Sequence, residues 1–329
     1  MLNLREYAET QVLLADYLPW ACLVAPGVVL NKDGSFQTTF KYRGPDLESS
    51  TEEELVSVTA RVNNVLRRFG SGWALFFEAQ RHEVHDYPET DFSDALSWLV
   101  DQERALQAEE ASARFESAYY LTLLWLPPAD ATGRAEKALI QRAETEDAAT
   151  WRHRLETFEQ HAGRVFDLLS TCLAEIAKLS DDETLTYLHS TISTKRHPVV
   201  TPELPVFLDA VLADEPFAGG LEPMIGAAHL RTLTILGFPA STLPGILDEL
   251  NRQGFAYRWA TRFIAMDKAE AEKVLGKKRR HWFAKRKSIG AVLRETMFNE
   301  QAALVDNDAD NKAVDADAAL QELGSDLVS

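Results

Sequence analysis

The sequence has 329 residues and carries 34 Lys and Arg against 51 Asp and Glu, a formal net charge of −17. Its 46% hydrophobic and 26% charged residues are typical of a globular protein, and the acidic balance argues against broad nucleic-acid binding, because phosphate contacts need a positive face. Cys22 and Cys172 are too few thiols for a disulfide framework or a thiolate zinc site, which indicates a reducing cytoplasm.

The first predicted elements are a helix, a β-hairpin and a second helix. Residues 4–20 alternate charged side chains with Leu, Val and Tyr at roughly helical spacing, which predicts a short amphipathic helix. Asn-Lys-Asp-Gly at residues 31–34, between two apolar runs, is typical of a hairpin turn. Thr51 and Glu54 fit a capping box, so a helix should run from there to about Phe69.

Two apolar runs, WALFFEAQ at residues 73–80 and YYLTLLWL at residues 119–126, predict strands that are covered on both faces. A helix is expected between them, over residues 91–114. No apolar run reaches the roughly 18 residues of a membrane-spanning helix. The side chains expected in the core are Leu75, Phe77, Leu121, Leu123 and Leu233.

The second half of the chain predicts a helical stretch followed by another pair of strands. Residues 133–194 have a helical pattern, residues 229–238 and 256–266 read as strands, and residues 242–253 read as a helix between them. From residue 267 onward the pattern is one long helix or two. The predicted fold class is α+β: a mixed sheet with a β-hairpin and interleaved helices, a helical insertion and a long C-terminal helix.

The predicted organisation has four segments. They are an N-terminal α/β segment over residues 1–132, a helical insertion over residues 133–199, a second α/β segment of the same domain over residues 200–266 and a long helix, first basic and then acidic, over residues 267–329.

The sequence contains no recognisable motif for nucleotide or metal chemistry. A Walker A loop needs G-x-x-x-x-G-K-[ST], but the only Gly-Lys pair is Gly276-Lys277, and Ala271 stands where the first glycine should be. His82 and His85 are one residue too close for the H-E-x-x-H zinc motif and predict a solvated loop. We therefore predict no catalytic, cofactor-binding or metal-binding residue in this chain.

A basic run at residues 273–287, KVLGKKRRHWFAKRK, holds eight Lys and Arg and no acid. A cationic helix with an aromatic centre can meet phosphates, anionic lipid headgroups or an acidic protein. The alternative is neutralisation within the protein, because residues 295–329 carry nine acids and one Lys. The side chains predicted to contact an anionic partner are Lys277, Lys278, Arg279, Arg280, Trp282, Lys285, Arg286 and Lys287.

Several stretches carry a family resemblance, among them LPWACLVAPGVVLNKDGSF, RRFGSGWALFFEAQRH, FLDAVLADEPFAGGLEP and WFAKRKSI. In collinear order over essentially the whole chain, they resemble the N-terminal part of the CagE/TrbE/VirB family of type IV secretion ATPases. The resemblance implies a cytoplasmic protein peripheral to the inner membrane, which forms homo-oligomers and energises assembly of a channel and its pilus. It also implies ATP and Mg bound by a RecA-like ATPase domain that is absent from this chain, so no catalytic residue can be carried over.

Two functions of different classes stay open. The first is a docking and assembly domain without catalysis of its own, with other secretion subunits at the inner membrane as partners and peripheral lipid contact as an option. The second is a nucleic-acid-handling module of the conjugation machinery that uses residues 273–287. The net charge of −17 favours the first.

Overall fold

The structure is a computed structural model. It describes residues 13–46, 49–84, 87, 90–110, 114–127, 144–235 and 247–286. The chain divides into two compact units, one of residues 1–68 and 72–263 and the other of residues 69–71 and 264–329.

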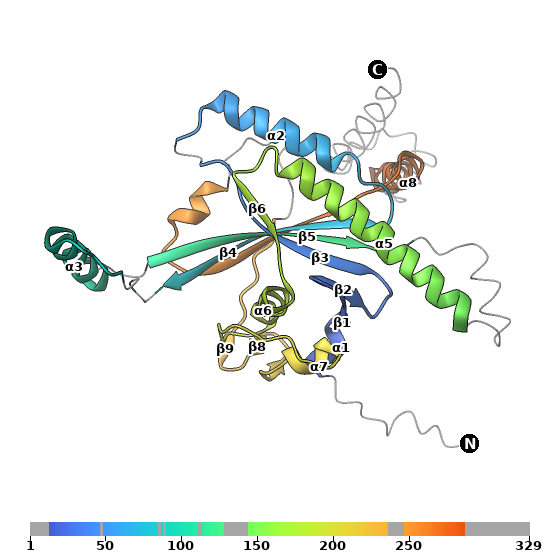
Figure 1. Ribbon diagram of the computed structural model, residues 1–329. Helices are drawn as coiled ribbons and strands as arrows, with labels where there is room; N and C mark the ends of the chain where they lie inside the picture. Colours follow the sequence, from blue (N-terminus) through green and yellow to red (C-terminus); the bar gives the residue numbers. More distant parts are fainter. Residues whose placement is uncertain are drawn as a thin grey trace. The chain divides into compact units, whose positions relative to one another are not determined.

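The first unit is built on a seven-stranded sheet with the strand order β1-β2-β3-β5-β4-β10, in which β6 also pairs with β3 (Figure 1). The pairs β1–β2, β2–β3, β3–β5, β3–β6 and β4–β5 are antiparallel. The strands are β1 (Trp20–Ala25), β2 (Val28–Asn31), β3 (Phe36–Arg43), β4 (Trp73–Val84), β5 (Arg114–Trp125), β6 (Glu175–Lys178) and β10 (Tyr257–Ile264). A separate small sheet contains β7 (Phe217–Ala218), β8 (Met224–Ile225) and β9 (Ala228–His229).

Helices cover both faces of the large sheet, so the α+β class is confirmed. In Figure 1, α2 and α5 lie on one side of the sheet and α6 and α7 on the other. The helices are α1 (Leu14–Tyr17), α2 (Glu52–Leu66), α3 (Ala95–Glu110), α5 (Glu144–Leu169), α6 (Asp181–Ile192), α7 (Leu208–Leu212) and α8 (Lys268–Arg286), with a 3-10 helix at Asp248–Arg252.

The hairpin turn predicted at residues 31–34 is confirmed, but a further turn divides the apolar run before it into β1 and β2. Gly27 makes this turn with a φ of 63°, a left-handed conformation that glycine adopts without strain. A Cβ at this position would also collide with the carbonyl oxygen of Leu179. The Gly27 N–H donates to Asp181 Oδ1 at 2.6 Å, which ties the turn to the start of α6.

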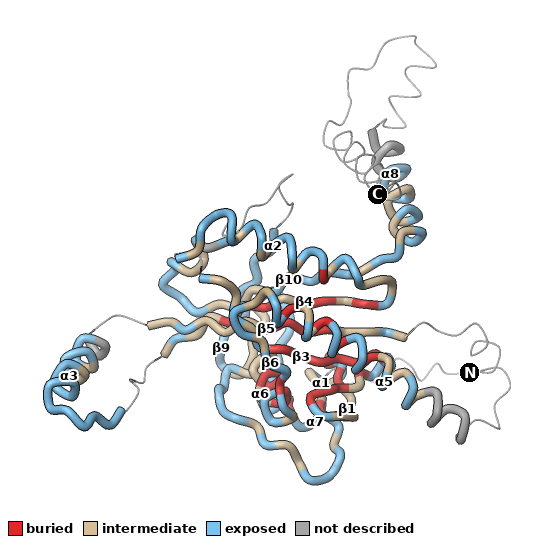
Figure 2. The backbone as a smooth tube through the Cα atoms, turned by 45° about the horizontal axis from the view of Figure 1, so that its top comes forward, coloured by how far each residue is buried: buried red, intermediate tan, exposed pale blue. Residues whose placement is uncertain are grey.

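One face of the sheet packs against α5 through aromatic rings. Phe158 of α5 is fully buried, and its ring centroid lies 5.7 Å from that of Phe36 and 5.8 Å from that of Trp73. Figure 2 shows buried residues gathered along β3, β4 and β5 in this region. Because successive side chains of a strand point to opposite faces, the same strands also supply the layer on the other side.

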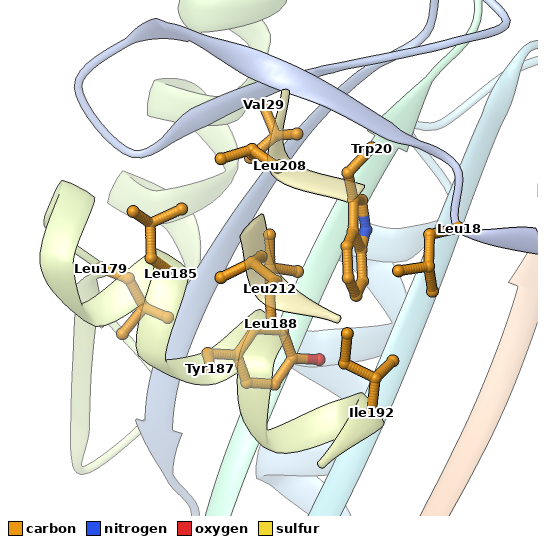
Figure 3. Close-up of a cluster of buried hydrophobic side chains, with 10 residues drawn as sticks. All are labelled: Leu18, Trp20, Val29, Leu179, Leu185, Tyr187, Leu188, Ile192, Leu208 and Leu212. Atoms are coloured by element: carbon orange, nitrogen blue, oxygen red, sulfur yellow. The ribbon is translucent and has the colours of Figure 1, made fainter. Parts of the chain in front are cut away.

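The opposite face carries a cluster of buried hydrophobic side chains between β1, β2 and the helices α6 and α7 (Figure 3). A capping box starts α6, since the Ser180 hydroxyl accepts from the Glu183 N–H while Glu183 accepts from the Ser180 N–H. The ten buried members are Leu18, Trp20, Val29, Leu179, Leu185, Tyr187, Leu188, Ile192, Leu208 and Leu212.

The predicted elements of the first half are confirmed, with shifted ends. The capping box of Thr51 and Glu54 is present and α2 ends at Leu66. Strand β4 continues past residue 80 to Val84, because its outer part pairs with β5. Of the N-terminal helix predicted over residues 4–20, only the four residues of α1 are helical within the described part.

The second half holds the larger corrections. Residues 175–178 form β6 in the main sheet and not a helix, because β3 offers them a free edge. The strand predicted over residues 229–238 is wrong for residues 230–235, which have no regular structure. Residues 242–246 of the helix predicted over residues 242–253 lie outside the described residues, and the four-segment division stays a prediction.

Three of the five predicted core side chains are confirmed. Leu75, Leu121 and Leu123 are at most 3% exposed. Phe77 is only half-buried, because it borders an open groove. Leu233 is 92% exposed, because the segment that holds it does not join the sheet.

Candidate functional site

The predicted anionic-partner surface lies on α8, the helix of the second unit. Its four central basic residues, Lys277, Lys278, Arg279 and Arg280, are all exposed. Trp282, Lys285 and Arg286 continue the same helix, but their side chains lie outside the described residues, as does all of Lys287. A single helix therefore presents the basic run, as predicted, whereas its contact with a partner stays a prediction.

The distribution of charge along α8 suits a helix. Glu270 and Glu272 lie in its first turns, near the partly positive N-terminus of the helix. The run of Lys and Arg follows them, toward the partly negative C-terminus, so both groups interact favourably with the helix dipole. Before the helix, the Asp267 N–H donates to the Ser71 hydroxyl at 2.9 Å, and that hydroxyl donates to Glu270. The basic run thus follows a start that is fixed by hydrogen bonds.

A buried carboxylate, Glu78 of β4, is the centre of a polar network that sequence reasoning missed. Arg258 of β10 places its Nε 2.6 Å from one carboxylate oxygen, and the Tyr187 hydroxyl donates to the other at 2.8 Å. Gln80 donates to the same carboxylate at 2.8 Å. Burial and the nearby Glu78 charge raise the pKa of Tyr187. These contacts of Glu78 tie β10 and α6 to β4, which is a structural role.

A second polar cluster joins the end of α6 to the loop after α7. His189 is 3% exposed, and its Nε2 lies 3.2 Å from Asp214 Oδ1. Burial opposes ionisation of Asp214, but hydrogen bonds from Lys195, Ser193 and His189 outweigh it and lower the pKa of Asp214 to about 2. Lys195 lies 2.9 Å from the second carboxylate oxygen. The burial of His189 beside this carboxylate indicates a structural role for the cluster.

The described residues contain no group of three His, Cys, Asp or Glu side chains placed to hold a metal ion. His82 was predicted in a solvated loop, which is wrong, because it lies on β4 opposite Glu116 of β5. Burial lowers the pKa of His82. Across the part of the chain that the structure describes, no helix is both long and apolar enough to cross a bilayer.

A large groove, which the sequence did not predict, opens between α2 and the sheet. Its volume is about 1940 Å³, and the rings of Tyr42, Phe77 and Tyr119 form its floor. Burial, assisted by Tyr119, raises the pKa of Tyr42 to about 12. The apolar side chains of α2 that line it are Leu55, Val56, Val58, Val62 and Leu66. The groove explains why Phe77 is only half-buried.

Comparison with known proteins places this fold in a family. Residues 27–133, from β2 to the end of β5 and beyond, match the model of the "Type IV secretion system ATPase VirB4/TrbE, N-terminal domain". The chain is 31% identical to the conjugal transfer protein TrbE of Rhizobium radiobacter over 343 residues, which cover 99% of this chain and 41% of that protein.

Two further relatives agree. The first of the two pieces of a probable conjugal transfer protein TrbE from Sinorhizobium fredii is 35% identical over 148 residues, 44% of this chain and 99% of that piece. The type IV secretion system protein virB4 of Brucella suis is 22% identical over 282 residues, 80% of this chain and 34% of its own length. The chain thus spans less than half of the Rhizobium radiobacter relative and about a third of the Brucella suis one.

These matches confirm the resemblance that the sequence motifs indicated. The chain therefore belongs to the VirB4/TrbE family of type IV secretion system ATPases, and its matched residues are the N-terminal domain of that family.

Proposed function

We propose that this chain is the docking and assembly domain of a type IV secretion ATPase for conjugal transfer, without catalysis of its own. The observation that carries the proposal is its match to TrbE over 99% of the chain, which spans 41% of that relative. ATP and Mg would bind in the part of the relatives that this chain does not span. There they would energise assembly of the channel and its pilus.

The docking surface that we propose is the basic helix α8, against an anionic surface at the inner membrane. Four consecutive cations, from Lys277 to Arg280, are exposed on α8, and the two acids of that helix lie in its first turns. Each Lys or Arg close to an anionic bilayer contributes on the order of 1 kcal/mol, so a cluster of four is enough for peripheral binding. The acidic remainder of the chain would be repelled by that surface, which fixes the orientation of the domain.

Charge neutralisation tests this proposal. We expect the full chain to float with vesicles that contain anionic phospholipid and not with neutral vesicles. Changing Lys277, Lys278, Arg279 and Arg280 together to Gln should reduce flotation by about tenfold or more, with an unchanged melting temperature. The matched control changes four exposed arginines outside α8 to Gln, namely Arg152, Arg164, Arg231 and Arg262, and should float like the wild type.

Each other outcome contradicts the docking surface in a distinct way. A lower melting temperature of the α8 variant would mean that the cluster is neutralised within the protein, for instance by the acidic residues 295–329. Tighter binding to labelled single-stranded DNA than to vesicles at physiological salt would favour the nucleic-acid-handling module. Equal flotation of all three proteins would make the cluster a solvated helix face.

A further inference from the structure

Helix α3 exposes large apolar side chains to solvent from its first turn to its third. It is inserted between β4 and β5, beyond the point where Val84 pairs with Arg114. Figure 2 shows no buried residue on the described part of this helix. Its large apolar side chains, each between 46% and 68% exposed, are Leu96, Trp98, Leu99, Val100 and Leu106. Exposed apolar side chains gathered on one element are typical of an interaction surface.

A hydrogen bond holds one side of α3 against the chain that leads into it. The Tyr87 hydroxyl donates to Asp101 Oδ1 at 2.7 Å, and the Arg114 guanidinium carbon lies 5.8 Å from the centroid of the Tyr87 ring. Asp101 and Ala105, one turn apart, are half-buried, whereas the other described side chains of α3 are exposed. The side of α3 that carries Asp101 is therefore its inner side.

The apolar face of α3 lies on the opposite, outer side. At 3.6 residues per turn, Leu96, Leu99 and Val100 point away from Asp101, and Leu106 extends their face by about two turns beyond Leu99. The spacing i, i+3 and i+4 of the first three is the pattern of a helix that anchors itself in the apolar surface of a partner.

A carboxylate lies in the middle of this apolar face. Glu103 follows Leu99 and Val100 by one turn, is exposed, and accepts a hydrogen bond from Gln107 Nε2 at 3.3 Å. It forms no ion pair with any residue that the structure describes. A partner that covers the face removes water from this charge, which is costly unless the partner supplies a Lys or Arg at that point.

The charges around Glu103 are acidic as well. Residues 90–110 contain six acids and one arginine. Glu109 and Glu110 end α3, where the helix dipole is already negative, and its last turn has no basic residue. The complementary surface is therefore both apolar and basic.

The same charges argue against other occupants of this face. Anionic lipid headgroups and nucleic acid would be repelled by the acids. Insertion into the hydrocarbon of a bilayer would carry Glu103 with it, without a cation to pair with. A convex helix face also lacks the concave shape of a small-molecule site.

From these observations we infer that α3 binds a basic amphipathic helix of another protein. The four apolar side chains of the outer face pack against the apolar stripe of that helix, and Glu103 pairs with a Lys or Arg within the stripe. The contact goes beyond the proposed docking function, because it involves neither α8 nor a membrane.

Two synthetic helical peptides of about 18 residues are the probes. The first consists of Leu and Lys, with the leucines on one face and one Lys among them, and the second has Glu in place of every Lys. Fluorescence anisotropy of the labelled peptides measures their binding to the full chain. The wild type should bind the Leu/Lys peptide at least about tenfold more tightly than the Leu/Glu peptide.

Variants of α3 locate the binding. Glu103→Lys should weaken binding of the Leu/Lys peptide by about tenfold or more and strengthen binding of the Leu/Glu peptide. Leu99→Gln should weaken binding of the Leu/Lys peptide by about tenfold or more, with an unchanged melting temperature, because Leu99 is exposed in the free protein.

Matched controls separate this contact from the general attraction of a cationic peptide to an acidic protein. Glu222→Lys makes the same change of net charge at an exposed position outside α3, and Leu221→Gln removes a fully exposed leucine there. Both should bind the two peptides like the wild type.

Three results would overturn the inference. The first is a wild-type chain that does not bind the Leu/Lys peptide or binds both peptides equally. The second is a Glu103→Lys chain that behaves like the Glu222→Lys chain, because the peptide would then bind elsewhere. The third is flotation of the wild type with phospholipid vesicles that Leu99→Gln abolishes, because lipid would then be the occupant. Loss of flotation on changing α8, with peptide binding intact, leaves this inference untouched, so the two proposals fail separately.

Discussion

The two ends of one sheet face are covered very differently. Under α5, the rings of Phe36, Trp73 and Trp125 stack on Phe158, and nothing of Phe158 is exposed. Under α2, the rings of the same three central strands stay half-buried and border an open groove. Both ends have several aromatic side chains, so the number of apolar side chains does not determine which end is tightly packed.

The two helices also have similar patterns. In α5 the buried stripe is Phe158, Ala162, Val165 and Leu169, at spacings i, i+4, i+7 and i+11. In α2 the corresponding stripe is Leu55, Val58, Val62 and Leu66, yet only the neighbouring Val65 is buried. An amphipathic stripe thus shows which face a helix turns to the core, but not how closely the helix approaches it.

At the closed end, Phe158→Ala should cost about 3–5 kcal/mol of the free energy of unfolding, because it empties a ring-sized space beside three aromatic partners. Chemical denaturation of the wild type and the variant measures this. Gln160→Ala, two residues later on the exposed side of α5, serves as control. A cost below about 1 kcal/mol would show that the closed end is not the more tightly packed one.

On the face of the sheet that α6 covers, Arg258 ties the edge strand β10 to Glu78 of β4. Arg258→Ala should cost about 2–3 kcal/mol, because it leaves the buried Glu78 charge without its cation, although Tyr187 and Gln80 still donate to it. Hydrogen exchange should rise along β10. Arg262→Ala, an exposed neighbour on the same strand, should leave both quantities near the wild-type values.

The buried hydroxyl of Tyr42, on the floor of the groove, should make the stability of the protein depend on pH at high pH. The folded pKa of Tyr42, about 12, lies above its unfolded value of about 10, so Tyr42 favours the folded state below pH 10. This contribution is lost as the pH rises from about 10 to about 12, and it amounts to at most about 2 kcal/mol. Tyr42→Phe should flatten that part of the stability curve, whereas Tyr17→Phe, which changes an exposed ring, should not.

The smallest changes in the free energy of unfolding are expected for one valine in each of these two helices. Val165→Ala in α5 should cost about 1–2 kcal/mol, whereas Val58→Ala in α2 should cost under about 0.5 kcal/mol, because its side chain borders open space and Ala favours a helix. Equal costs would contradict the difference between the two ends.

Local signals in the sequence predicted the local elements well. The turn at residues 31–34 and the capping box of Thr51 and Glu54 depend on side chains within a few positions of one another, and both are confirmed. The runs around Leu75 and Leu123 predicted buried strands, because a continuous apolar run needs cover on both faces. The family motifs were likewise contiguous strings, and the comparisons confirm them.

Long-range features were out of reach of the same signals. Residues 175–178 read as helix, and only the free edge of β3 makes them a strand. Glu78 in an apolar strand was a signal for a buried partner, since an unpaired carboxylate is too costly there, but nothing in the sequence pointed to Arg258, 180 positions away. Leu233 was expected in the core from its pattern alone, although burial requires a neighbouring strand.

Composition and neighbouring residues were enough to predict the α+β class, the central strands, the family and the basic character of α8. Three other features became visible once the chain was folded: which helix packs closely on its face of the sheet, which cation pairs with Glu78 and which apolar surfaces stay exposed. Those outcomes depend on the distance at which two separately formed elements come to rest. Side-chain volume summed over both of them sets that distance, and the pattern of either one alone does not contain it.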